Sequence, residues 1–239
     1  METSTLPQST PDRYARVASP IHTIVVLAVL GGWAFQAKIF MDKLGAATDP
    51  HRLRTYFFSI CLEWLVFLLV LAGVRWSGAS MLIVLGDHWH SLRAVLRDIG
   101  VAAGFWVVAA VVLWTSSKLL GISALPRNME VLMPHGPAEL TLWVVLSVTA
   151  DICEETIFRG YLQRQFMALT NNAPAGILLS AAAFGAAHAY QGFRRVILIG
   201  VFGAMFGILA YWRRSVRPGM IAHAWQDTLG GVVGSLMRH

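Results

Sequence analysis

Four charged residues lie close together within an apolar stretch that runs from Ala138 to about Met167: Asp151, Glu154, Glu155 and Arg159. In a lipid-embedded helix each such side chain costs about 2.5–3.5 kcal/mol, so four could cost on the order of 10 kcal/mol. They must therefore face a water-filled cavity, pair with one another or lie close to the membrane interface. The first two arrangements support chemistry, whereas a charge cluster at a shortened helix end would be structural.

Helical spacing gives the two glutamates different surroundings. Glu155 and Arg159 are four residues apart with the acid first, which is the favourable orientation for an ion pair on a helix. Glu154 points about 100° away around the helix, so it stays available to a substrate or a water molecule. Asp151 precedes both glutamates by one turn and could join either group.

Two further segments each place a histidine on an apolar helix. Phe184 and His188 share a helix face at a spacing of four residues, so the aromatic ring could fix the orientation of the imidazole. His223 and Asp227 have the same spacing, and a carboxylate beside an imidazole can set its tautomer and raise its basicity. The structural alternatives are an interfacial histidine at position 188 and a simple hydrogen bond between His223 and Asp227.

A glutamate, two histidines and an aspartate are groups that can activate a water molecule and stabilise an oxyanion. Glu154, His188 and His223 could equally form a site of two histidines and one carboxylate for a divalent metal such as zinc. The sequence lacks the HExxH pattern of the common zinc proteases. The residue types thus indicate hydrolytic acid–base chemistry, with or without a metal.

The composition predicts that these residues lie in a membrane protein. Of the 239 residues, 56% are hydrophobic and only 13% are charged, with a mean hydropathy of +0.59, whereas a soluble domain has about a quarter charged residues. The net charge of +6 comes from Lys and Arg in short groups between apolar runs, which is typical of anchors at anionic headgroups. Because no segment concentrates this charge, nucleic-acid binding is not expected.

Apolar stretches of about 20 residues predict an all-α, polytopic transmembrane helical bundle with about seven spans. The first span is expected to stay uncleaved, because it is long for a signal peptide and lacks a small-x-small cleavage site. The expected spans are Ile21–Phe40, Tyr56–Val74, Ile99–Lys118, Ala138–Met167, Ala173–Tyr190, Val196–Trp212 and Gly219–Met237. Helix starts are expected at four prolines: Pro20, Pro137, Pro174 and Pro218.

These spans divide the chain into three parts. Residues 1–20 form a polar N-terminal tail, residues 21–137 form N-terminal transmembrane helices and connectors, and residues 138–239 form a core that carries the charged residues and the two histidines. Within the middle part, Met81–Arg97 is expected to be an interfacial connector and Gly121–Gly136 a loop.

Other features of the sequence receive structural interpretations. Gly203 and Gly207 form a small-xxx-small pattern, which favours close helix packing. An ionisable residue inside a span is functional by default, but Glu63 is expected to pair with an inward-facing polar group. Cys153 is interpreted as a small buried thiol. His22 and the five other histidines that lie outside the two histidine pairs are expected in loops or at the interface.

Three short motifs occur in order, each on its own apolar span. The segment Glu154-Glu155-Thr-Ile-Phe-Arg159 resembles the EExxxR motif of the CPBP family, the CAAX-processing and bacteriocin-processing intramembrane proteases. Phe184-x-x-x-His188 resembles the FxxxH motif of that family. His223-x-x-x-Asp227 resembles its third motif, a histidine followed four residues later by Asn or Asp. The resemblance covers roughly Ala138 to Gly231.

The resemblance implies a helical bundle with its site in a membrane-embedded polar chamber. It implies that Glu154 and His188 activate a water that attacks a peptide carbonyl, while His223 and the residue at position 227 stabilise the oxyanion. An ionised Asp227 cannot donate a hydrogen bond as Asn would, so we expect Asp227 to orient His223 or to be protonated. Three further motif residues would support these groups: Glu155, Arg159 and Phe184.

Both metal-dependent and metal-free glutamate mechanisms fit this resemblance. We expect a metal-free mechanism with no cofactor, and Glu154, His188 and His223 as ligands if a metal such as zinc is bound. The expected partners are the lipid bilayer and a membrane-associated protein or peptide substrate. The expected location is a cell membrane, as a multi-pass protein of prokaryotic type.

Three classes of function are compatible with the sequence. An intramembrane endopeptidase is expected first. A non-enzymatic membrane scaffold or bacteriocin-immunity protein could retain the same residues. A proton- or metal-coupled transporter could use them as a relay, but the paired repeats with broken helices of many transporters are not visible in the sequence.

Overall fold

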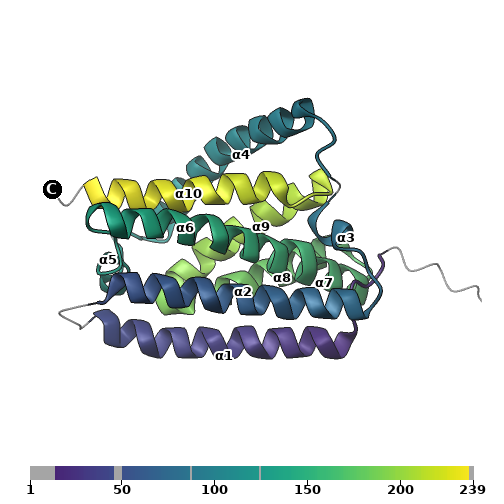
Figure 1. Ribbon diagram of the computed structural model, residues 1–239, viewed down its shortest axis with the longest axis horizontal. Coiled ribbons are helices and arrows are strands. Elements are labelled where there is room, and N and C mark those ends of the chain that lie inside the picture. Colours follow the sequence, from purple (N-terminus) through teal and green to yellow (C-terminus); the bar gives the residue numbers. More distant parts are fainter. Residues whose placement is uncertain (1–13, 46–49, 87, 124, 237–239) are drawn as a thin grey trace, which may run out of the picture.

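The computed structural model describes residues 14–45, 50–86, 88–123 and 125–236. Over these ranges the chain forms helices and no strand (Figure 1), which confirms the predicted all-α fold. The first 13 residues of the predicted polar tail, and the end of the last predicted span beyond residue 236, lie outside the described residues.

The helices begin where the prolines and polar caps of the sequence favour a start. Pro20 is the first residue of α1. Ser91 and Asn172 cap two later helices, α4 and α8, by accepting hydrogen bonds from Ala94 N and Ala175 N. The elements are α1 (Pro20–Gly45), α2 (Arg52–Trp76), α3 (Met81–Leu85), α4 (Leu92–Leu119), α5 (Arg127–Glu130), α6 (Gly136–Glu154), η1 (Glu155–Leu162), α7 (Gln163–Thr170), α8 (Ala173–Ala187), η2 (Ala189–Gln191), α9 (Phe193–Arg213) and α10 (Arg217–Leu236).

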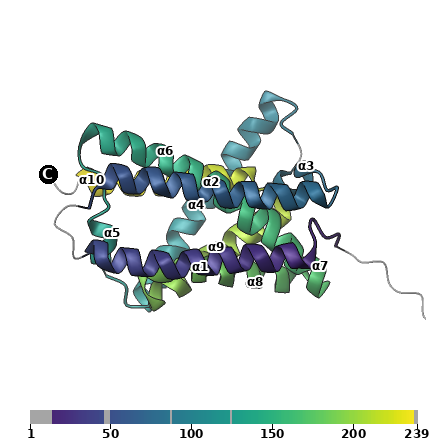
Figure 2. The same cartoon turned by 60° about the horizontal axis from the view of Figure 1, so that its bottom comes forward.

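The long helices run along the long axis of the molecule and alternate in direction (Figure 1). The α1–α2 end, on the left of Figure 1, holds the end of α1 and the start of α2; the α2–α3 end lies on the right. Helices α2, α6, α10 and α4 lie side by side in this order, and α8 pairs with α9. Figure 2 shows the same alternation after a turn about the horizontal axis, with α1 packed against α8 and η2.

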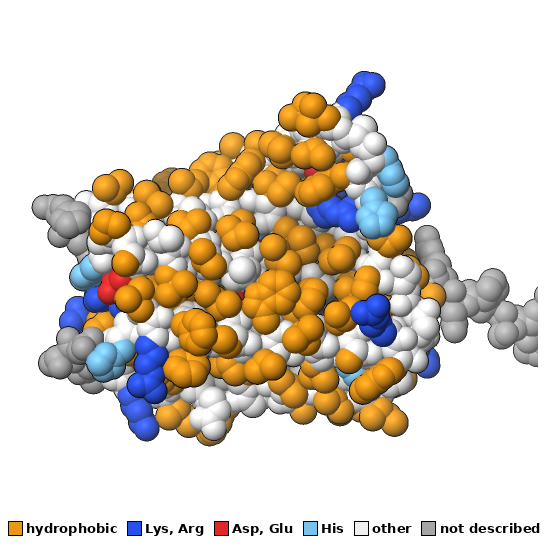
Figure 3. All heavy atoms as spheres, viewed as in Figure 1, with side chains coloured by type: hydrophobic (Ala, Val, Ile, Leu, Met, Phe, Trp, Pro, Cys, Tyr) orange, Lys and Arg blue, Asp and Glu red, His pale blue; other side chains and the backbone are white. Residues whose placement is uncertain are grey.

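Among the described residues, four helices, α1, α2, α4 and α9, are long and apolar enough to cross a membrane. Only 11–28% of their most apolar windows is buried inside the protein, so most of these apolar side chains face outward. Figure 3 shows hydrophobic side chains over the middle of one face, with most of the Lys, Arg and His side chains toward the two ends. The chain is therefore a multi-pass membrane protein, and the predicted number of seven spans stays a prediction.

Two predicted boundaries differ from the structure. Helix α4 begins at Leu92, seven residues before the predicted span at Ile99, because Ser91 caps the helix and its first turns carry Arg93 and Arg97 at the end of the molecule. The predicted interfacial connector is therefore confined to α3 and the segment that follows it. The predicted loop Gly121–Gly136 contains the single turn of α5.

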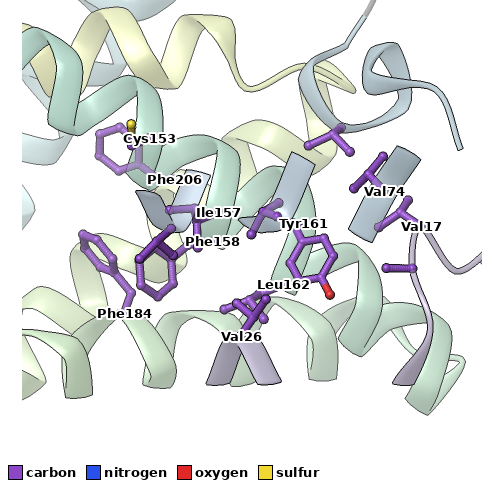
Figure 4. Packing of buried hydrophobic residues seen from close by; sticks show 14 of the residues in the cluster. Val17, Val26, Val74, Cys153, Ile157, Phe158, Tyr161, Leu162, Phe184 and Phe206 are labelled. Atoms are coloured by element: carbon purple, nitrogen blue, oxygen red, sulfur yellow. The ribbon is translucent and has the colours of Figure 1, made fainter. Parts of the chain in front are cut away.

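The core is centred on η1, and all eight of its residues are buried. Figure 4 shows Phe158 of η1 beside Phe184 of α8, with ring centroids 5.0 Å apart, and Phe206 of α9 near Cys153. Gly160 allows α3 to pack directly on η1, because an added Cβ would lie 2.6 Å from the Val84 side chain and 2.8 Å from its carbonyl oxygen. The charged motif therefore lies in the most tightly enclosed part of the protein.

A buried glutamine fastens the start of α1 to the core. The Oε1 atom of Gln165 accepts hydrogen bonds from the backbone N–H groups of Val17 and Ala18 at 2.8 and 3.2 Å. Its amide nitrogen donates to Ala18 O at 2.9 Å and to Thr23 Oγ1 at 2.6 Å. All four partners belong to the N-terminal segment, so one side chain fixes the chain as it enters α1.

His22 lies in the same network and in the first turn of α1, so it is not in a loop, and its expected place at the membrane interface stays a prediction. Its Nε2 lies 3.1 Å from the carbonyl oxygen of Leu69, which can only accept, so Nε2 carries the proton. The Tyr161 hydroxyl then donates to Nδ1 over 2.7 Å. The histidine thus joins α1 and α2 to η1.

We predict that Gln165→Leu lowers the stability of the protein by about 2 kcal/mol or more, because it leaves buried backbone groups without partners. Thermal unfolding of the full-length protein in detergent, followed by intrinsic tryptophan fluorescence, measures the change. Gln36→Leu is the matched control, since Gln36 is exposed on α1. Equal melting temperatures for the two variants would contradict the role of Gln165.

Candidate active site

The first motif lies at a change of helix type. Helix α6 ends at Glu154, and η1 continues from Glu155 as a π-helix, in which each N–H bonds five residues back. The Ser180 hydroxyl of α8 donates to the Phe158 carbonyl at 2.6 Å and ties the neighbouring helix to this segment. The sequence predicted an ordinary helix through the motif, and π-helical segments are frequent at functional sites.

Glu155 and Arg159 form the predicted ion pair. Arg159 Nη1 lies 2.9 Å from Glu155 Oε1, and both side chains are almost fully buried. The guanidinium stacks on the Phe184 ring, 4.1 Å from its centroid, and Nη2 donates to Gly203 O at 3.4 Å. The predicted supporting role of Phe184 thus includes a contact with the arginine as well as with the histidine.

Two of the glycines of α9, Gly203 and Gly207, accept hydrogen bonds from η1 and from the first residue of α7. Arg159 donates to Gly203 O, and Gln163 donates to Gly207 O at 3.0 Å. The donors are four residues apart, as are the acceptors, so the two parallel helices are held in one register. An added Cβ at Gly207 would lie 2.7 Å from Gln163 Oε1. The small-xxx-small pattern therefore serves polar contacts in addition to the close packing predicted from sequence.

His223 of α10 lies between three carboxylates. Its Nδ1 is 3.2 Å from Glu155 Oε1 and 3.4 Å from Asp151 Oδ1, and both acids are buried. Its Nε2 faces the other way and lies 4.0 Å from Glu154 Oε2. Because carboxylates accept, Nδ1 carries a proton, and Nε2 is the nitrogen that faces Glu154.

His188 follows the last residue of α8. Its Nδ1 lies 2.9 Å from the carbonyl oxygen of Phe184, which fixes the proton on Nδ1. Its Nε2 lies 3.7 Å from Glu154 Oε1. The sequence predicted that the Phe184 ring orients this imidazole; the ring contacts it at a centroid distance of 4.8 Å, and the backbone carbonyl sets its tautomer.

Glu154 is the point at which the three motifs meet. Its two oxygens face His188 and His223 at 3.7 and 4.0 Å, both longer than a direct hydrogen bond. Its side chain is 20% exposed, while Glu155 is fully buried, as the helical spacing predicted. A water molecule or a substrate oxygen can therefore lie among these three side chains.

Asp227 lines the same cavity from α10 and is exposed. Its backbone carbonyl accepts a hydrogen bond from Trp143 Nε1 at 3.0 Å. Asp151 and Glu155 are the carboxylates in contact with His223 in the described part of the chain, whereas the sequence analysis expected Asp227 to orient it. The catalytic role of Asp227 stays a prediction.

A cavity of about 940 Å³ connects the site to the α1–α2 end. Its inner part is lined by Glu154, His188 and His223, and its outer part includes Pro50 and His51 between α1 and α2. The hydrophobic cluster around η1 closes the α2–α3 end, where Tyr161 is fully buried. Helices α1 and α2 supply many of the residues that line this cavity, so the N-terminal part of the chain contributes to the site.

The structure offers a metal ligand set that differs from the one inferred from sequence. Asp151, Glu154 and His223 each present one ligand atom, all within 4.8 Å of one another, whereas the sequence suggested His188 in place of Asp151. However, Asp151 approaches Nδ1 of His223 and Glu154 approaches Nε2. The two carboxylates thus face different edges of the ring, which does not favour one ion shared by all three residues at about 2 Å.

Glu63 is the residue at this site that sequence reasoning placed least well. It was expected to pair with an inward-facing polar group, but its Oε2 atom is buried without a hydrogen-bond partner among the described residues. It lines the cavity from α2. A stripe of polar residues at a spacing of four, Thr55, Ser59 and Glu63, was the signal in the sequence that could have identified it.

Comparison with known proteins gives a family match over the part of the chain that holds the three motifs. Residues 136–229 match the family model described as Rce1-like, type II CAAX prenyl endopeptidase Rce1-like. This segment of the chain is similar to the Rce1-like family. No curated protein and no solved structure matches the chain. The resemblance inferred from the short motifs is thereby confirmed at the level of the family, which is one of proteases.

The Rce1-like segment extends from the start of α6 into α10. It therefore includes Glu154, His188, His223 and Asp227, while α1, α2 and α4 precede it. Helices α1 and α2 nevertheless form one wall of the cavity. The family match covers the proposed reacting groups, and helices α1, α2 and α4 lie outside it.

We predict that Arg159→Met destabilises the protein by about 3–5 kcal/mol, because it leaves Glu155 buried without a counter-ion. In Glu155→Gln/Arg159→Met the buried charge is absent, and much of the lost stability should return. Thermal unfolding in detergent compares the two variants, with Arg54→Met as the control for an exposed arginine. A double variant no more stable than Arg159→Met would show that the ion pair does not account for the loss.

Proposed function

We propose that the protein is an intramembrane endopeptidase in which Glu154 activates a water molecule for attack on a peptide bond. The observation that carries this proposal is the placement of Glu154 opposite the Nε2 atoms of His188 and His223, at 3.7 and 4.0 Å, on a cavity. The similarity of residues 136–229 to an endopeptidase family supports the same reaction class.

Glu154 is the general base in this proposal. Its neighbour Glu155 is neutralised by Arg159, so Glu154 is the carboxylate at the motif that can accept a proton from water. The water oxygen attacks the carbonyl carbon of the substrate while the proton moves to Glu154. His188, whose Nδ1 proton is held by Phe184 O, presents Nε2 as an acceptor that positions the same water.

His223 is the proposed electrophilic partner. When Nε2 is also protonated, it donates to the oxyanion that forms on the carbonyl oxygen. Asp151 and Glu155 lie at Nδ1 and stabilise the positive charge on the ring, as a buried aspartate does for the imidazolium in serine proteases. Collapse of the tetrahedral intermediate transfers the proton from Glu154 to the leaving amine.

The substrate in this proposal is a membrane-associated protein or peptide. The cavity opens toward the α1–α2 end and is lined mainly by apolar side chains, so it accepts an extended peptide segment from that end. The bilayer that surrounds the outward-facing apolar helices is the second partner. A multi-pass protein of a prokaryotic cell membrane is the setting that we propose.

We predict that Glu154→Gln lowers cleavage by about 10²–10⁴-fold, because the amide cannot accept the proton of the attacking water. The measurement is a comparison of protein termini, by mass spectrometry, in membranes that contain the native protein or the variant at matched levels. Glu139→Gln is the control, since Glu139 contacts Arg52 at the start of α6.

New termini that occur with the native protein and with Glu139→Gln, but not with Glu154→Gln, would support the proposal. Equal cleavage by a folded Glu154→Gln variant would reject the role of this carboxylate. Identical termini in all three samples would favour the scaffold or immunity function, and ion flux in proteoliposomes that depends on Glu154 would favour the transporter.

A metal-assisted form of the reaction is the second candidate, because Asp151, Glu154 and His223 cluster closely enough to be considered as ligands. A divalent ion there would polarise the carbonyl and lower the pKa of its bound water. The approach of the two carboxylates to different nitrogens of His223 leads us to prefer the metal-free reaction.

We predict that 1,10-phenanthroline or EDTA changes cleavage by less than about twofold, since the preferred mechanism uses no metal. The purified protein should also contain far less than one equivalent of zinc by elemental mass spectrometry. Loss of activity on chelation, together with stoichiometric zinc and recovery on zinc addition, would establish the metal-assisted form instead.

A further inference from the structure

Glu63 is a buried carboxylate that the proposed reaction does not use. It lies in the middle of α2, a helix that is long and apolar enough to span a membrane. Its Oε2 atom is buried and lacks a hydrogen-bond partner among the described residues. It lines the cavity that holds Glu154, and it lies within electrostatic reach of Glu154, Asp227 and His223. An ionisable group in this position is costly unless a partner reaches it.

A polar stripe leads along α2 to this residue. Thr55, Ser59 and Glu63 recur every four residues and all line the cavity. On the rest of this helix Phe57, Leu65 and Leu68 are exposed apolar side chains, as expected for contact with lipid. The cavity side of α2 therefore offers polar contacts to a hydrated group that moves from the α1–α2 end toward Glu63.

The charges along the cavity are separated by depth. Glu63, Glu154 and Asp227 lie in the middle of the molecule on α2, α6 and α10. The arginines that line the cavity, Arg54 and Arg195, lie in the first turns of α2 and α9 at the α1–α2 end.

Neither the two arginines that line the cavity nor the buried Arg159 places a positive charge beside Glu63. Arg54 and Glu63 are separated by nine residues of one helix, about 13 Å along its axis, and the Arg54 guanidinium lies over the Phe58 ring at 5.5 Å. The buried Arg159 is engaged by Glu155. The inner part of the cavity thus has an excess of carboxylates over basic side chains in the described part of the chain.

We propose that Glu63 forms a subsite for a cationic group of the substrate, next to the scissile bond. The matching chemistry is an ammonium or guanidinium group, which donates charge-assisted hydrogen bonds to the carboxylate of Glu63. A lysine or arginine side chain of the substrate is the source that we favour, because the cavity continues past Glu63 to both histidines and so accommodates an internal segment of peptide. This inference rests on the proposed peptidase function.

Direct binding tests the subsite without requiring cleavage. The probes are fluorescent, N-acetylated decapeptides of apolar sequence that carry lysine or norleucine at one of the four central positions. Their affinity for the full-length protein in phosphatidylcholine nanodiscs is measured by fluorescence anisotropy. At one position lysine should bind at least about tenfold more tightly than norleucine, the value of a hydrogen bond to a charged group.

Variants assign this preference to Glu63. In Glu63→Gln the ratio between lysine and norleucine peptides should fall to within about twofold, while Glu63→Asp should retain part of it. Glu130→Gln removes a carboxylate that pairs with Arg127 outside the cavity and should leave the ratio unchanged. A norleucine peptide with a free amino terminus shows whether an α-amino group satisfies the same subsite.

Equal affinity for lysine and norleucine peptides at all four positions would overturn the inference, as would an undiminished ratio in Glu63→Gln. Cleavage of the same peptides separates this result from the proposed function. Cleavage that depends on Glu154 but shows no preference for a basic residue would leave the peptidase intact and reject the subsite. A preference in binding with no cleavage would retain the subsite and reject the peptidase.

Discussion

A carboxylate that leaves water for the interior of a membrane protein loses several kcal/mol of hydration unless a cation and hydrogen-bond donors replace the water. Glu155 meets this requirement through Arg159, whose guanidinium is held in turn by Gly203 O and by the Phe184 ring. The neutralised Glu155 then positions His223 from α10. One ion pair thus joins η1, α8, α9 and α10, and leaves Glu154 free to face the cavity.

The sequence predicted the parts of this arrangement that depend on local spacing. The pairing of Glu155 with Arg159 and the separate orientation of Glu154 follow from positions one and four residues apart on one helix. The order of the three motifs also identified the family, because each motif pairs specific residue types at a fixed distance. The all-α fold followed from long apolar runs, in which backbone polar groups are satisfied within each helix.

The remaining features depend on contacts between segments far apart in the chain. The contact of Asp151 with His223 depends on the packing of α6 against α10. No short sequence pattern indicates whether Asp151 or Asp227 contacts this histidine. Likewise, Gln165 and Val17 are separated by 148 positions in sequence. The surroundings of Glu63 were predicted wrongly for a related reason. An isolated acid in an apolar span indicates that something polar faces it, but the sequence alone does not distinguish a polar cavity from a buried partner residue.

Helix α8 has only 15 residues, about 22 Å at 1.5 Å per residue, whereas the hydrocarbon layer is about 30 Å thick. It starts at the α2–α3 end, is too short to cross such a layer alone, and is followed directly by His188. The two ends of the bundle are consequently not equivalent: the packed core closes the α2–α3 end, and the α1–α2 end is continuous with the cavity. In the proposed peptidase, polypeptides inserted with opposite polarity would therefore present different bonds to the same residues, so the topology of a substrate would determine where it is cut.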